Sequence, residues 1–269
     1  MHVLLRNVIA GTAVFGLAGC ATLEKIDREL YGVHQSVTKE DVVTGQRSIG
    51  FHTRAEQIEA GNATMQRILG KYASLNERVD RRAYTRLQRI FMRVHTVSHF
   101  AHEDWDVLLL PEDGFNAFVT GGTSIAVYKG LLDETRDDAA VAAVIGHEIG
   151  HVSANHVFEQ QQALTALAAR PGTGFDFAYG ALNEEEADKI GVLYTALAGY
   201  DPYAVSRLWG RFARAYGDDW SWFRTHPAGS DRARATRLLA EKAEPYYRPD
   251  VVNPAHEQLV RCNVFWCNR

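Results

Sequence analysis

The segment with the clearest chemical potential is His147-Glu148-Ile149-Gly150-His151, late in a run rich in alanine and valine. Residues four apart in a helix lie on the same face, so His147 and His151 can point at one metal ion with Glu148 beside them. This spacing is typical of zinc hydrolases, in which the glutamate acts as general base. The apolar neighbours predict a buried helix, where unpartnered polar side chains would be costly. The alternative is a helix that merely carries two satisfied histidines.

A catalytic zinc site needs three protein ligands and one open position, so a third ligand must come from another segment. An acidic stretch of sequence Glu-Glu-Glu-Ala-Asp begins at Glu184 and ends at Asp188, one helical turn along the same face. We expect Glu184 to be the third ligand and Asp188 to accept a hydrogen bond from His147. Glu185 and Glu186 are expected to meet solvent. Spacing alone leaves the choice among the three glutamates open, and a solvated acidic first turn is the alternative.

Composition indicates one well-cored globular domain. The 269 residues are 46% hydrophobic and 23% charged, which is ordinary for such a domain. The net charge of -4 gives no indication of a nucleic-acid partner. No apolar run after the N-terminus approaches the roughly 20 residues that a membrane helix needs.

The first 19 residues predict a signal peptide. Residues 8–17 form a short apolar stretch after Arg6, and Leu17-Ala18-Gly19-Cys20 ends it. This ending resembles the bacterial lipoprotein processing box, which implies cleavage before Cys20 and acylation of its thiol. The implied protein is exported and tethered to a membrane. In a Gram-negative organism, Ala21 rather than aspartate after the cysteine favours the outer membrane, with the domain facing the periplasm. An ordinary signal peptide with an incidental Cys20 is the alternative.

Two further cysteines, Cys262 and Cys267, lie close together near the C-terminus. An exported compartment permits a disulfide between them. We favour the disulfide over a metal knuckle because no second pair of ligands lies nearby, and such a short loop would mainly pin the tail.

Hydrophobic periodicity predicts a mostly helical α+β domain after a lead-in without sustained periodicity. One or two helices are expected over residues 54–100, with a break near 72–80. Further helices are expected at 135–169, 183–198, 201–216 and 230–244. Strands are expected at 105–110 and, as two short pieces around a Gly-Gly turn, within 115–128.

A strand just ahead of the metal helix can act as an open edge, on which an extended peptide adds main-chain hydrogen bonds. We expect such an edge between Asn116 and Tyr128. Asn116, Gly122 and Ile125 are its candidate substrate-contacting residues. Ordinary core strands are the alternative.

Three histidines, His95, His99 and His102, cluster at the end of the predicted 54–100 segment. A second metal site is conceivable there. We favour a solvated helix terminus, because no acidic residue stands between the histidines at the spacing of the first motif and histidine suits a helix C-terminus.

Several separated motifs together resemble the zinc metallopeptidase family of HtpX, the CAAX prenyl proteases and the envelope protease BepA. In chain order they are Asn116-Ala117-Phe118, Gly121-Gly122, His147–His151, Glu184–Asp188, Ala198–Pro202 and Thr225-His226-Pro227 with Arg232. The resemblance covers roughly residues 54–239. It implies a zincin-like fold of the gluzincin type, one Zn²⁺ ion and Glu184 as third ligand. It also puts His226 near the metal, as a removable ligand or an oxyanion stabiliser, with Arg232 supporting that region.

The resemblance implies a zinc-dependent endopeptidase of the bacterial cell envelope that degrades misfolded or stalled envelope proteins. Polypeptide substrates and the outer-membrane assembly machinery are the expected partners. The chain resembles a short lipoprotein-type member. We divide it into a signal peptide (1–19), an acylated cysteine with a tether (20–53), a zinc metallopeptidase domain (54–245) and a tail (246–269). The alternative function is a periplasmic chaperone or assembly factor with a latent or structural zinc site.

Overall fold

The computed structural model describes residues 38–40, 47–49, 53–158, 181–216 and 230–261. It separates into two compact units, and the smaller contains an antiparallel hairpin of β1 (Thr38–Glu40) and β2 (Arg47–Ile49). Neither strand was predicted, because three residues are too few for an alternating pattern to emerge.

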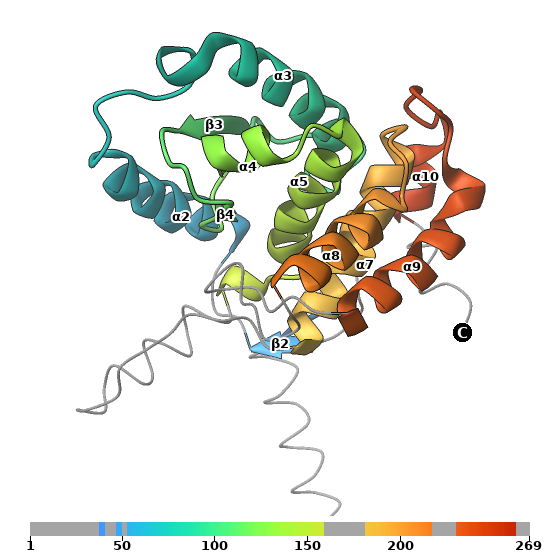
Figure 1. Cartoon of the computed structure of the whole chain (residues 1–269). Coiled ribbons are helices and arrows are strands. Elements are labelled where there is room, and N and C mark those ends of the chain that lie inside the picture. Colours follow the sequence, from blue (N-terminus) through green and yellow to red (C-terminus); the bar gives the residue numbers. More distant parts are fainter. Residues whose placement is uncertain (1–37, 41–46, 50–52, 159–180, 217–229, 262–269) are drawn as a thin grey trace, which may run out of the picture. The chain divides into compact units, whose positions relative to one another are not determined.

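The larger unit begins with two helices, α2 (Arg54–Leu69) and α3 (Glu77–Thr96) (Figure 1). Thr53 starts α2 with a capping box, in which its hydroxyl accepts from Glu56 N and the Glu56 carboxylate accepts from Thr53 N. The break between the helices falls where it was predicted. The apolar face of α3 is buried in the core through Leu87, Ile90, Phe91 and Val94.

A three-stranded sheet follows, composed of β3 (Asp106–Leu110), β4 (Ala117–Val119) and β5 (Ser124–Tyr128). The strand order is β3-β5-β4, with β5 parallel to β3 and antiparallel to β4. The strands occur in the segments where they were predicted. The central position of β5 was not predicted, because strand order depends on pairing between distant segments.

The expected substrate edge needs correction. Ile125 pairs with Val107 on one side and with Val119 on the other, so it lies in the middle of the sheet. Gly122 lies in the β4–β5 turn beneath α2, where its carbonyl accepts from Arg54. The carbonyl of Asn116 accepts from Tyr128 N and therefore points inward. The three chosen residues do not line an open edge.

The helix with the two-histidine motif is α5 (Asp138–Ser153), which follows the short α4 (Lys129–Glu134). The side chain of Asp137 accepts from Ala139 N and starts α5. Asn155, with a φ of 63°, follows its last turn. The predicted helix of 135–169 therefore starts later, at Asp138 after the Asp137 cap, and is interrupted after Ser153, where Asn155 adopts a left-handed conformation. The predicted residues 159–169 lie outside the described residues.

Helix α7 (Ala181–Leu197) packs along α5 through glycines (Figure 1). A Cβ atom on Gly191 would lie 2.6 Å from His147 N, and one on Gly146 would lie 2.9 Å from the carbonyl oxygen of Gly191. A Cβ on Gly150 would lie 2.8 Å from the oxygen of Ala187. These distances leave no room for a side chain, so the two backbones are in direct contact.

Helices α8 (Ala204–Tyr216) and α9 (Ser230–Ala243) pack against each other, and α9 also packs against α7. A 3₁₀ turn, η1 (Glu244–Tyr246), and α10 (His256–Arg261) follow. The described part of the predicted tail returns to the core, because Asn253 N donates to the oxygen of Leu197 and Val260 is buried. The mostly helical α+β class is confirmed. No helix among the described residues is long and apolar enough to cross a bilayer.

Replacing Gly191 by alanine should lower the free energy of unfolding by about 1–3 kcal/mol, because the methyl group would overlap the backbone of His147. Urea denaturation of the chelator-treated protein measures the change. Gly210→Ala in α8 is the matched control, since its Cβ would come no closer than 3.4 Å to another side chain. Alanine there should leave stability unchanged or raise it by up to about 1 kcal/mol. Equal losses in both variants would contradict the close-packing argument.

Candidate metal centre

Helix α5 presents His147 and His151 on one face and buries both imidazoles, which are 4% and 0% exposed. Their Nε2 atoms lie 2.9 Å apart, and the ring planes are nearly perpendicular at 88°. Two ring nitrogens that close can both direct their lone pairs to one ion. The spacing of four residues therefore brings the histidines together as predicted.

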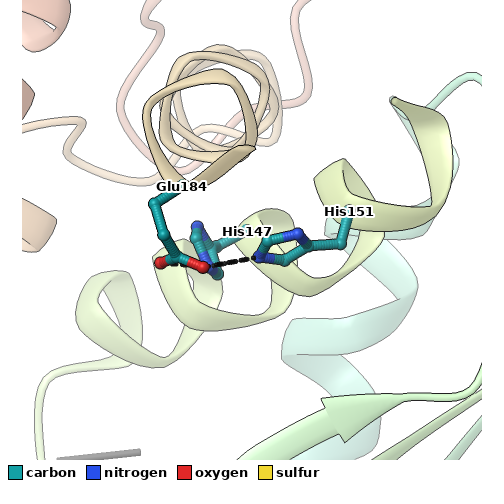
Figure 2. Close-up of side chains that lie close together, drawn as sticks. All are labelled: His147, His151 and Glu184. Carbon is teal, nitrogen blue, oxygen red and sulfur yellow. Dashed lines mark hydrogen bonds and ion pairs between the residues drawn. The ribbon is translucent and has the colours of Figure 1, made fainter. Parts of the chain in front are cut away.

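Glu184 reaches the same point from α7. One carboxylate oxygen lies 3.3 Å from His151 Nε2, and the other lies 3.6 Å from His147 Nε2. Figure 2 shows the carboxylate facing both rings. Ligand atoms around a tetrahedral zinc ion, at 2.0–2.1 Å from the metal, lie about 3.3 Å from one another. The three side chains fit one zinc ion, and within the described ranges they form the only such group.

Asp188 lies one turn after Glu184, and its Oδ1 is 2.9 Å from His147 Nδ1. A proton on Nδ1 would be donated to this carboxylate, which leaves the Nε2 lone pair of His147 for a metal. Burial lowers the pKa of His147, although the Asp188 hydrogen bond and the Glu184 charge oppose this shift. The imidazole is therefore favoured in the neutral form that a metal ligand requires.

Arg232 of α9 joins the two carboxylates of α7. Its guanidinium bonds to both oxygens of Asp188 at 2.7 and 2.8 Å, and to Glu184 at 2.7 Å. Burial raises the pKa of Asp188, but the charge and hydrogen bonds of Arg232 outweigh it and hold that pKa below its usual value. The guanidinium lies 4.2 Å from the ring centre of Trp209 in α8, a cation–π contact that the sequence analysis missed.

Glu148 lies beside the ligands in α5 and is only 1% exposed. Burial lowers the pKa of Arg232, but the charge and hydrogen bonds of Asp188, together with the charges of Glu184 and Glu148, raise that pKa above its usual value. A buried carboxylate next to a metal site is placed to hold and transfer protons.

Two residues that sequence reasoning missed extend the centre behind His151. His156 Nδ1 lies 3.0 Å from His151 Nδ1, and His156 Nε2 lies 2.9 Å from a carboxylate oxygen of Glu186. Glu185 is exposed as expected, whereas the Glu186 side chain is only 16% exposed and pairs with His156. A third histidine shortly after the motif was the available signal, but nothing local connected it with Glu186.

A family model described as peptidase family M48 matches residues 81–170 and 161–240, more than half of the chain. The chain belongs to peptidase family M48. The resemblance inferred from the motifs is thereby confirmed at the level of the family. Membership also identifies zinc as the ion that suits the three converging ligands.

Relatives of this M48 chain carry the names of metalloendopeptidases. The mitochondrial metalloendopeptidase OMA1 of Arabidopsis thaliana is 33% identical over 170 residues, which cover 56% of this chain and 35% of the relative. The beta-barrel assembly-enhancing protease of Yersinia pestis is 27% identical over 169 residues, covering 51% and 35%. That of Escherichia coli K12 is 25% identical over 185 residues, covering 57% and 38%. The chain thus spans little more than a third of the length of these relatives.

Some predicted functional residues of the M48 chain lie outside the described residues. These are His226, the acylation site Cys20 and the cysteine pair Cys262 and Cys267. Their roles stay predictions.

The histidines at the end of α3 form no second metal site among the described residues. His95 is buried and stacks against core aromatic rings, so the expectation of a solvated terminus was wrong for it. His99 Nδ1 bonds to the hydroxyl of Tyr194, which also lies 3.0 Å from Ser153 Oγ. Burial lowers the pKa of His99 to about 4.

This low pKa predicts a specific loss of stability in acid. The unfolded chain binds a proton at His99 near the ordinary pKa of 6.5, whereas the folded protein binds it only near 4. The free energy of unfolding should therefore fall as pH decreases from about 6.5 to 4, by about 3 kcal/mol from this residue. His99→Gln should remove that part of the pH dependence in urea denaturation. His102→Gln, at an exposed position nearby, is the control and should retain it.

Proposed function

We propose that the chain is a zinc-dependent endopeptidase of the bacterial cell envelope. The observation that carries the proposal is the convergence of His147, His151 and Glu184, with Glu148 buried beside them. Structural zinc sites are usually closed by four ligands, often cysteines, whereas three nitrogen and oxygen donors are the set of a catalytic site.

Bound zinc would acidify a water molecule and polarise the carbonyl of the scissile peptide bond. The carboxylate of Glu148 would accept the proton of the attacking water and deliver it to the leaving amine. Asp188 would hold His147 in one orientation and tautomer, while Arg232 balances the charge of Asp188 and Glu184. The family resemblance adds His226 as a stabiliser of the developing oxyanion.

The substrate would add to the outer edge of β4. Because Asn116 faces β5 through its carbonyl, alternation along an antiparallel strand turns the main-chain groups of Ala117 and Val119 away from β5. Ala117 is 0% exposed and Val119 is 9% exposed, so a substrate would have to uncover this edge before it could add to it. At the opposite edge of the sheet, Asn76 bonds to both main-chain groups of Leu109 and partly closes β3. Strand β4 packs near α5, so an extended polypeptide added there would run close to the metal ligands.

The proposed location is the periplasmic face of the outer membrane, through an acylated Cys20. This location rests on the N-terminal segment, because the names of the relatives point to different settings. The Arabidopsis relative is named as mitochondrial, whereas the bacterial relatives are named as beta-barrel assembly-enhancing proteases. The proposed substrates are misfolded or stalled envelope proteins, and the assembly machinery of the outer membrane is the proposed partner.

Glu148→Gln should reduce cleavage of a casein-type substrate by about 10²–10⁴-fold, because the amide cannot accept the proton of the attacking water. The variant should still bind one zinc ion, measured by metal analysis, and unfold at the same urea concentration as the parent. A chelator should abolish cleavage by the parent. Glu185→Gln, at an exposed position in α7, is the matched control and should cleave normally.

Cleavage by Glu148→Gln at the parental rate would refute the assignment of the base. Cleavage that survives removal of zinc would refute the metallopeptidase itself. If neither protein cleaves but both suppress aggregation of an unfolded substrate, the chaperone alternative is the better description.

A further inference from the structure

The turn after α5 brings His156 into contact with His151, one of the proposed metal ligands. Asn155 adopts a φ of 63° directly after the helix, and its side-chain oxygen accepts a 2.8 Å hydrogen bond from Gln57 of α2. The next residue, His156, is consequently 2% exposed and faces the ring of His151, with the ring centres 5.2 Å apart. The turn therefore places a third imidazole in contact with a proposed ligand.

The hydrogen-bonding pattern defines where the protons lie in this pair. The Nδ1 atoms of His151 and His156 are 3.0 Å apart, so one donates and the other accepts. His151 needs its Nε2 lone pair for the metal, which leaves its proton on Nδ1. His156 must then accept at Nδ1 and carry its own proton on Nε2, where a carboxylate oxygen of Glu186 lies 2.9 Å away. With both rings neutral, the hydrogen bond from His151 to His156 and the hydrogen bond from His156 to Glu186 can form together.

We infer that His156 and Glu186 are positioning residues that fix the orientation and tautomer of His151. The inference rests on the proposed function, because it assumes that His151 binds zinc. The two ligand histidines are then oriented in different ways. His147 donates directly to the carboxylate of Asp188, whereas His151 donates to an imidazole that in turn donates to a carboxylate. Partners of this kind typically change metal affinity by about 10–100-fold when they are removed.

A purely structural role predicts different behaviour. His156 and Glu186 also connect the turn after α5 with α7. If that connection were their only role, their replacement would lower the stability of the metal-free protein without a separate effect on zinc affinity. Zinc affinity and metal-free stability must therefore be measured on the same variants.

The test compares His156→Leu with His156→Asn in the full chain. Leucine removes the acceptor that His156 provides for the Nδ1 proton of His151, and the zinc dissociation constant, measured by competition with a chromogenic chelator, should rise about 10–100-fold. Asparagine can place its side-chain oxygen near the former Nδ1 and accept that proton, so the constant should stay within a few-fold of the parent. Glu186→Gln should weaken binding by less than His156→Leu, and Glu185→Gln should not change it. Urea denaturation after chelation records the stability of each variant.

Rescue of zinc affinity by asparagine, with similar metal-free stability of the two His156 variants, supports the positioning role. Parental zinc affinity in His156→Leu overturns it, whatever the effect on stability. Equal loss of affinity in both variants also overturns it, because an acceptor for His151 would then not matter. Failure of the proposed function is distinguishable, since the parent would then bind no zinc or show no chelator-sensitive cleavage, and the inference would fall with it.

Discussion

The direct contact between the backbones of α5 and α7 is the constraint on which the rest of the structure depends. Gly146 and Gly150 on one helix and Gly191 on the other remove the side chains that normally separate packed helices. A glutamate side chain is short, so its carboxylate reaches the imidazoles of a neighbouring helix only when the axes are close. The alanine- and glycine-rich composition of α5 therefore has a geometric role, because it lets α7 bring Glu184 to His147 and His151.

Close approach also concentrates charge in a buried space. Glu148, Glu184 and Asp188 are all almost fully buried within two adjacent helices. Three carboxylates there would be strongly unfavourable without compensation. Arg232 compensates two of them directly, and the face of Trp209 covers its guanidinium. Helices α8 and α9 thus take part in the centre without supplying a metal ligand, because they position the cation that makes the carboxylates tolerable.

The two histidines of the motif have equivalent positions in the helix but different surroundings. His147 faces α7, where Asp188 is one turn from Glu184 and can reach its Nδ1. His151 lies in the last turn of α5, and the turn at Asn155 that follows supplies His156 instead. Both arrangements leave Nε2 available for a metal. The surrounding fold meets one chemical requirement twice with different residues.

The spacing of residues along the sequence determined that His147 and His151 share one helix face and that Asp188 lies one turn after Glu184. It also determined the approximate positions of most helices and strands. A spacing of four residues fixes relative direction within one helix, and alternation does the same within a strand. The tertiary structure alone decided that β5 is central and Ile125 is not at an edge, that Glu186 meets His156, and that Trp209 covers Arg232. Each of these depends on which segments, distant in the chain, come into contact, and periodicity carries no information about the partner of a face. For that reason the sequence, together with the family resemblance, was sufficient to propose His147, His151 and Glu184 as metal ligands and Asp188 as the partner of His147. The contacts of His156, Glu186 and Trp209 emerged only from the packing of the tertiary structure.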